Sequence, residues 1–184
     1  MTETRLFSKN MKCRKEVRRL YDASFPDDER IPWPVLTAGL NEHRRMYVHF
    51  DEGTFIGLSY VFLSRDIAYL GYLAVEEHLR LRGYGSQILQ ALRSELSDFR
   101  FVIDIEVVTK EAGNYEERQK RREFYLRNGF VSTGAGYYFY HVDYELLCAG
   151  AMVTADEFRD LIIEHWGHRA RHAVFKVLKS DDES

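Results

Sequence analysis

Two arginines and two glycines stand close together between a strand-like run and a helix-like run. Arg80, Arg82, Gly83 and Gly85 form the pattern Arg-x-x-Gly-x-Gly. Glycine has no Cβ, so the backbone can turn tightly there and approach a ligand. The helix predicted next would offer unpaired amide groups and the positive end of its dipole. With the arginines, these groups suit a pyrophosphate, although a glycine-rich turn with solvated arginines is the alternative.

Two other phosphate-binding motifs are excluded at this position. A dinucleotide-binding fingerprint needs a glycine or alanine three residues after Gly85, where Ile88 stands. A P-loop needs a glycine and lysine followed by serine or threonine, and the chain has no such run. A phosphate cradle of another kind is therefore the remaining functional interpretation.

A pair of carboxylates stands inside a β-rich run at 101–108. Side chains alternate between faces along a strand, so Asp104 and Glu106 share one face roughly 7 Å apart. Carboxylates in an apolar strand are costly unless they meet water, a cation or a hydrogen-bond donor. Acid–base chemistry and a structural ion pair, with an arginine such as Arg118 or Arg121, are both open.

Length and composition describe an ordinary globular chain. The 184 residues, of 21.7 kDa, are enough for one domain with a buried core. Twelve Phe and twelve Tyr need burial, which rules out disorder over most of the length. No apolar run is long enough to span a membrane. The formal net charge of −3 disfavours a nucleic-acid-binding protein.

Cysteine and histidine spacing indicates no metal site. Cys13 and Cys148 are far apart, and the first ten residues contain no secretory signal, so we expect two reduced thiols and a cytoplasmic location. His165, His168 and His172 form one cluster. No nearby cysteine completes it, and a mixed surface is the better interpretation.

Local patterns predict strands and helices that position these residues. Strands are expected at 5–8, 46–50, 54–63, 67–75, 101–108, 130–140 and 142–147, and helices at 10–24, 35–43, 86–96, 115–128 and 155–166. Short turns make the runs between 46 and 75 an antiparallel meander. The expected helix signals are Asn10 as the first N-cap, Pro26 as the first stop, Gly129 after the fourth helix, and Thr154 or Asp156 as the last N-cap.

These elements make one α/β domain over residues 1–184. We expect a core at 5–147, a helical extension at 148–178 and a polar tail at 179–184. The segment after residue 147 can cover a sheet edge or pair two subunits, so a homodimer is an open alternative.

The strand, Arg-x-x-Gly-x-Gly and helix run resembles the cofactor motif of the GNAT family of acyl-CoA-dependent N-acyltransferases. A second block agrees, because Phe124-Tyr125 and Gly129-Phe130 resemble the end of that family's later helix. The order of predicted elements is also that of the family, and the resemblance covers about residues 5–147. It implies a mixed, mostly antiparallel central sheet flanked by helices. Within the family, the segment 25–32 and the charged helix are similar to a bacterial group of uncharacterised proteins.

The resemblance implies acetyl-CoA as co-substrate. Backbone of Leu73 and Val75 would pair with the pantetheine arm. The pyrophosphate would lie beside Arg80, and the backbone amides at the start of the helix would bind it. These amides belong to Arg82, Gly83, Tyr84, Gly85 and Ser86. Asn114 stands where a pantetheine-binding asparagine is often found, although the helix between it and Tyr125 is longer than in the common pattern.

Acyl transfer to an amine needs a proton acceptor, an oxyanion donor and a proton for the departing thiolate. The resemblance gives the last role to Tyr125, and a tyrosine is close in proton affinity to an alkyl thiol. A backbone amide near Leu73 suits the oxyanion. Gly71 and Tyr72 stand where the family often has a base, so Glu106 becomes the candidate base or an anchor for a cationic amine.

The acceptor site would involve the loop between the first two helices. Glu29 and Arg30 abut an Ile-Pro-Trp run and are its candidate substrate residues, together with Asp104 on its strand. Half of the aromatic run 137–140 can also rim the pocket. The predicted function is transfer of an acetyl group to a primary amine of a small molecule or peptide. A non-catalytic acyl-CoA-binding regulatory module is the alternative.

Overall fold

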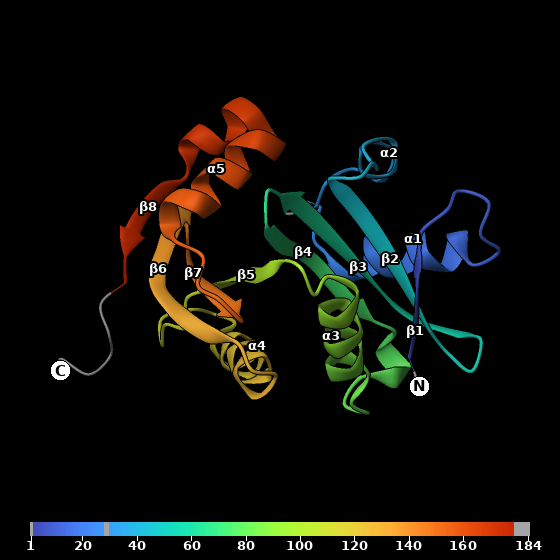
Figure 1. The fold of residues 1–184 in the computed structure, drawn as a ribbon. Helices are drawn as coiled ribbons and strands as arrows, with labels where there is room; N and C mark the ends of the chain where they lie inside the picture. Colours follow the sequence, from blue (N-terminus) through green and yellow to red (C-terminus); the bar gives the residue numbers. More distant parts are fainter. Residues whose placement is uncertain (1, 28–29, 179–184) are drawn as a thin grey trace. The chain divides into compact units, whose positions relative to one another are not determined.

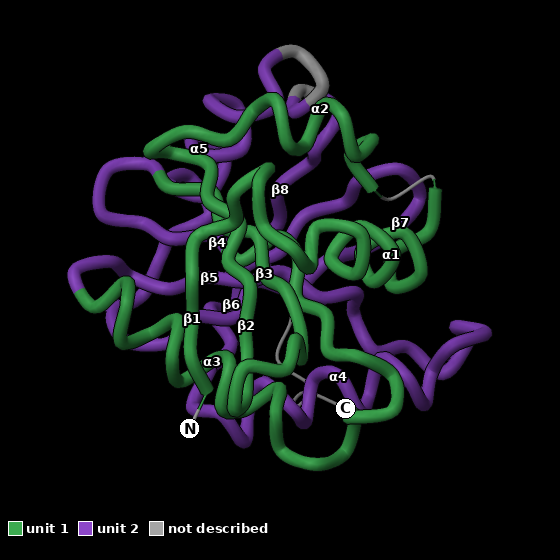
Figure 2. The backbone as a smooth tube through the Cα atoms, turned by 90° about the vertical axis from the view of Figure 1, so that its right-hand side faces the viewer, with its two compact units in different colours: residues 1–63, 70–97 green, residues 64–69, 98–184 purple. Residues whose placement is uncertain are grey.

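The computed structural model describes residues 2–27 and 30–178, apart from the side chains of 168, 169 and 171. The chain divides into two compact units (Figure 2). Unit 1 comprises Met1–Leu63 and Leu70–Ser97, and unit 2 comprises Ser64–Tyr69 and Asp98–Ser184. The expected boundaries of a core, a helical extension and a tail stay a prediction, and the tail lies outside the described residues.

Over the described residues, eight strands follow one another as hydrogen-bonded neighbours in the order β1-β2-β3-β4-β5-β7-β6-β8 (Figure 1). The sheet is mixed and mostly antiparallel, as predicted; the pairing of β4 with β5 is parallel. The strands are β1 Glu3–Leu6, β2 Arg44–Asp51, β3 Thr54–Ser64, β4 Ile67–Val75, β5 Arg100–Glu106, β6 Val131–Phe139, β7 Val142–Ala149 and β8 Val174–Val177. The helices are α1 Arg14–Ser24, α2 Trp33–Ala38, α3 Tyr84–Glu95, α4 Tyr115–Arg127 and α5 Ala155–Trp166, with short 3-10 turns at Glu77–Leu79 and Gly167–His172.

Unit 1 places helices on both faces of the predicted meander (Figure 1). On one face the Tyr60 hydroxyl donates to the carbonyl of Leu36 in α2, and Tyr72 packs against Tyr21 of α1. On the other face, Gly57 lies against the side chain of Ile88 in α3. The predicted apolar stripe of α3 is buried, so apolar packing of that face holds the helix on the sheet.

The beginning of the chain differs from the prediction. Asn10 is not an N-cap, because backbone hydrogen bonds close turns between Ser8 and Arg14 and α1 begins only at Arg14. It ends at Ser24, before Pro26, as expected. The second helix runs over Trp33–Ala38 rather than 35–43, because Pro32 and Pro34 suit its start and the chain is already extended at Arg44.

Unit 2 has α4 and α5 on opposite faces of its strands (Figure 1). Arg122 of α4 pairs with Glu145 of β7, whereas Phe158 of α5 packs against Tyr69 and Tyr137. The predicted bounds of α5 are confirmed. Its N-cap is Thr154, which exchanges a capping box with Glu157.

One strand of unit 2 was not predicted. β8 pairs antiparallel with β6, and Phe175 lies 5.3 Å from the ring of Tyr137. Four residues are too few for a period-two pattern to stand out in a sequence. The extended conformation of β8 therefore depends on its pairing with β6.

A buried histidine in unit 1 predicts an acid-sensitive contribution to stability. His49 is fully buried between the hydroxyls of Thr4 and Ser59, at 3.0 and 2.9 Å, and burial lowers its pKa to about 3. The unfolded chain takes up this proton near pH 6.5, so the stability is present above that pH and lost as the pH falls toward 3.

We expect His49→Gln to flatten this acid dependence. Between about pH 6.5 and 5 the wild type should lose about 2 kcal/mol through this residue, at about 1.36 kcal/mol per pH unit. Urea unfolding at about pH 7 and about pH 5 measures the difference between the two proteins. If the unfolding free energies of wild type and His49→Gln changed equally with pH, His49 would take up its proton in the folded state as readily as in the unfolded chain.

Candidate active site

The Arg-x-x-Gly-x-Gly loop of unit 1 forms an open, uncapped helix start. Gly83 has a left-handed φ of 84° and is the N-cap of α3, which has no side-chain cap. A Cβ built on Gly83 meets nothing within 4 Å, and Arg80 and Arg82 are exposed. The amides of the first turn of α3 are therefore accessible to an anion, and this geometry fits the pyrophosphate of a CoA thioester.

The motif strand β4 leads directly into this loop. Its parallel register with β5 covers Ile67–Tyr69, and Leu73 and Val75 lie beyond that paired segment. Arg80 donates from Nε to the carbonyl of Val75 at 3.3 Å. The hydroxyl of Tyr84 donates to Asp51, so it is the backbone of Tyr84, Gly85 and Ser86 that remains for the phosphates.

Tyr125 of unit 2 has an available hydroxyl. Its ring packs against Phe124 and Phe130, at 5.1 and 5.4 Å between centroids. No described residue hydrogen-bonds to the hydroxyl, and it is not among the buried polar atoms without a partner. Burial of the ring raises the pKa of Tyr125 to about 12. A purely structural tyrosine of the core would instead have a partner for this group.

Glu106 is bound by two arginines of α4. Its two carboxylate oxygens lie 2.7 Å from Arg118 and 2.9 Å from Arg121. Asn114, the N-cap residue of α4, contacts Glu106 at 3.5 Å and accepts a hydrogen bond from Arg118 at 2.7 Å. The structure shows the ion pair that was one interpretation of Glu106, and its roles as base or as anchor for a cationic amine stay predictions. The amide of Asn114 is engaged in the same network, so its role toward pantetheine stays a prediction.

This network docks the helix that carries Tyr125. No residue of α4 is fully buried, and its aromatic residues Phe124 and Tyr125 are half-buried. Glu106 on β5 and the buried Glu145 on β7 bind three arginines of the helix, with Arg122 2.9 Å from Glu145. The position of α4 therefore depends on two carboxylates of the strands beneath it.

Asp104 has partners of a different kind. Tyr69 of β4 donates to one carboxylate oxygen at 2.8 Å, and Tyr137 of β6 donates to the other. Tyr137 also stacks on Tyr144, with centroids 5.0 Å apart. Burial raises the pKa of Asp104, and the two tyrosine hydrogen bonds oppose that shift. Asp104 is thus a half-buried carboxylate bound by two tyrosine hydroxyls. Among the described residues, no cation forms an ion pair with it.

Comparison with known proteins decides the family. Residues 42–132 match the model of the acetyltransferase (GNAT) domain. The chain contains an acetyltransferase domain of the GNAT family. The match spans the meander, the Arg-x-x-Gly-x-Gly loop, Asp104, Glu106 and Tyr125. The resemblance seen in the sequence is confirmed, and with it acyl transfer and acetyl-CoA as the co-substrate. The comparison with curated protein sequences finds no match.

Solved structures share the fold of this GNAT protein at low sequence identity. A GNAT-family acetyltransferase from Bacteroides thetaiotaomicron has a TM-score of 0.74 at 20% identity, over 92% of this chain and 98% of that one. The ribosomal-protein-S18-alanine N-acetyltransferase of Escherichia coli has a TM-score of 0.60 at 14% identity, over 85% and 98%. An aminoglycoside 6′-N-acetyltransferase complexed with coenzyme A has a TM-score of 0.64 at 15% identity, over 84% and 99%.

Arg30 is bound to the end of α1 and to the residues of the loop that follow it. Its guanidinium donates to the carbonyls of Asp22 and Phe25, at 2.6 and 2.9 Å, and pairs with Asp27. These contacts fix the loop, and a role of Arg30 toward substrate stays a prediction. Glu29 lies outside the described residues.

The sequence did not predict that Tyr69 and Tyr137 bind Asp104. Tyr69 lies in a strand that pairs with β5, but no local pattern predicts which residues meet across a parallel pair. Tyr137 belongs to the aromatic run 137–140, of which alternation predicts half to be buried; the structure buries Tyr137 and exposes Tyr138 and Tyr140. Only the strand order brings both hydroxyls to one carboxylate.

In the part of the chain that the structure describes, neither a cluster of metal ligands nor a membrane-spanning helix occurs. Among the described side chains, no three His, Cys, Asp or Glu gather as metal ligands would. His168 of the histidine cluster has a side chain outside the described set. Within residues 2–27 and 30–178, every helix is too short or too polar to span a bilayer.

We expect Glu106→Gln to reveal a structural role rather than a base. The variant keeps the shape but removes the charge that two guanidiniums face, so melting should show a loss of about 2 kcal/mol. This is below the 3–5 kcal/mol of a fully buried pair because the side chain of Arg121 is 46% exposed.

Kinetics of the same variant separate the two roles. The folded Glu106→Gln protein should keep the pH profile of the wild type. A variant of unchanged stability whose kcat/KM falls at neutral pH and recovers at alkaline pH would instead make Glu106 the base.

Proposed function

We propose that this protein transfers an acetyl group from acetyl-CoA directly to a primary amine of a small molecule or a peptide. The observation that carries the proposal is the available hydroxyl of Tyr125 in a GNAT chain with an open cradle at Gly83. The aminoglycoside and ribosomal-protein enzymes of similar fold support an amine acceptor. A cytoplasmic location and a homodimer stay predictions.

A non-catalytic acyl-CoA-binding module is the competing function. Such a module needs the cradle but has no use for a tyrosine hydroxyl left without a partner or for a carboxylate with a raised pKa. A carboxyl group with a raised pKa costs stability when it is ionised at neutral pH, and such groups cluster at functional sites. We therefore favour the enzyme.

Tyr125 would serve the departing sulfur as a hydrogen-bond donor that keeps its proton. Its pKa of about 12 lies well above the value near 8.5 of an ordinary thiol. Complete proton transfer from Tyr125 to the thiolate is therefore uphill. A donated hydrogen bond still stabilises the negative charge that develops on sulfur.

Asp104 is the proposed partner of the acceptor amine. Its raised pKa makes it a stronger base than an exposed aspartate, and each oxygen bound by a tyrosine retains a lone pair. The carboxylate would accept a hydrogen bond from the ammonium group and take its proton. A backbone amide near Leu73 would stabilise the oxyanion.

We expect Asp104→Asn to lower kcat/KM about 100-fold at neutral pH, with recovery at alkaline pH where the amine loses its proton unaided. Because the folded pKa is raised, the ionised carboxyl costs stability at neutral pH, so loss of its charge should not lower the melting temperature. Asp143→Asn, which removes a half-exposed charge of β7, is the control. An Asp104→Asn enzyme with the kcat/KM of the wild type at neutral pH would exclude Asp104 as the base.

The function itself is tested by release of CoA over a panel of small amines and peptides, beside direct measurement of acetyl-CoA binding. Turnover of any amine, abolished by boiling the protein, supports the enzyme. Tight binding of acetyl-CoA without turnover over the whole panel would favour the regulatory module.

A further inference from the structure

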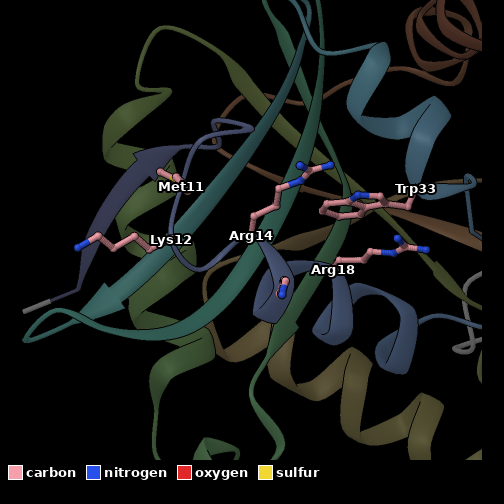
Figure 3. A pocket seen from close by; sticks show the side chains of 6 residues that line it. Met11, Lys12, Arg14, Arg18 and Trp33 are labelled. Atoms are coloured by element: carbon pink, nitrogen blue, oxygen red, sulfur yellow. The ribbon is translucent and has the colours of Figure 1, made fainter.

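A cationic groove of about 460 Å³ lies on unit 1. It is lined by Met11, Lys12, Arg14, Lys15, Arg18 and Trp33 (Figure 3). Four of these six residues are cations and none is an acid, although the whole chain carries a net charge of −3. The groove is therefore a local concentration of positive charge.

Three of the four cations of the groove have no side-chain partner among the described residues. Among the described residues, Lys12, Arg14 and Lys15 make no ion pair or hydrogen bond through their side chains, and only Arg18 pairs with an acid, Asp22 at 3.3 Å. All four are exposed. Arg14 and Arg18 are four residues apart in α1, and like charges at this spacing repel one another.

The floor of the groove is apolar and fixed. Trp33 is 5% exposed and packs against Phe7 and Tyr21, with ring centroids 5.7 and 5.9 Å apart. Figure 3 shows the side chains of Arg14 and Arg18 extending on either side of the Trp33 ring. Met11 adds a flexible apolar side chain at the rim.

We propose that this groove binds an acidic segment of a polypeptide that also carries an aliphatic side chain. Four exposed cations match several carboxylates, and the apolar surface of Trp33 between Arg14 and Arg18 matches an aliphatic side chain. A small ligand is a poorer match because its site would enclose most of it, whereas every cation here is exposed. The proposal does not depend on acetyl transfer.

The test is fluorescence anisotropy of a labelled short peptide in which a leucine is flanked by glutamate and aspartate. We expect saturable binding that weakens as salt rises, and none by the matched peptide with glutamine and asparagine. Lys12→Gln/Lys15→Gln should weaken binding about tenfold. Lys9→Gln/Lys110→Gln removes the same charge from exposed residues outside the groove and should leave binding unchanged.

Three results would overturn the proposal. The neutral peptide could bind as well as the acidic one, which excludes charge recognition. The control pair could weaken binding as much as the groove pair, which shows general attraction. A single-stranded oligonucleotide could bind more tightly than the peptide, which assigns the groove to nucleic acid. The acetyl-CoA melting shift of each variant verifies its folding independently of these outcomes.

Discussion

Tyr125→Phe should lower kcat about 100-fold while leaving acetyl-CoA binding nearly unchanged. The substitution removes only a hydroxyl that has no described partner, and the ring contacts with Phe124 and Phe130 can remain. Loss of an interaction made only as negative charge develops on sulfur lowers kcat rather than affinity. Steady-state kinetics and acetyl-CoA titration measure the two effects.

The matched control is Tyr115→Phe, which removes a hydroxyl from the first residue of the same helix. It should leave kcat unchanged. Because the pKa of Tyr125 is about 12, its proton stays bound throughout the neutral and mildly alkaline range, and no loss of activity there should arise from this residue. Equal turnover of Tyr125→Phe and wild type would exclude the donor role.

Gly85→Val should remove most of the stabilisation that acetyl-CoA confers. At a ligand concentration 100 times Kd the wild type gains about 2.7 kcal/mol. A valine that raises Kd about 100-fold leaves about 0.4 kcal/mol at the same concentration. Gly85 is not among the glycines with a left-handed φ, so the side chain obstructs the ligand without straining the backbone.

Gln90→Val is the control for this second prediction. It places the same side chain at an exposed position of α3, away from the helix start. Differential scanning fluorimetry with and without acetyl-CoA compares the two variants. An undiminished shift in Gly85→Val would mean that the cradle at Arg80–Ser86 does not hold the phosphates.

Local signals in the sequence were sufficient for most of the elements and for the open helix start at Gly83. Apolar alternation and short turns mark the meander, and Gly129 ends α4 with a φ of 81° that favours glycine. Arg80 to Gly85 act through a turn and the helix that follows it, so all their determinants lie within a few residues. Such features depend on contacts that are near in sequence, and a pattern therefore reveals them.

Tertiary structure decided the chemistry of the two carboxylates. Alternation places Asp104 and Glu106 on one face, but their environments differ because of residues far away along the chain. Glu106 meets Arg118 and Arg121 of α4, whereas Asp104 meets the hydroxyls of Tyr69 and Tyr137. Burial and partners set the charge and basicity of a carboxyl group, and both depend on strand order and register, which no local pattern contains.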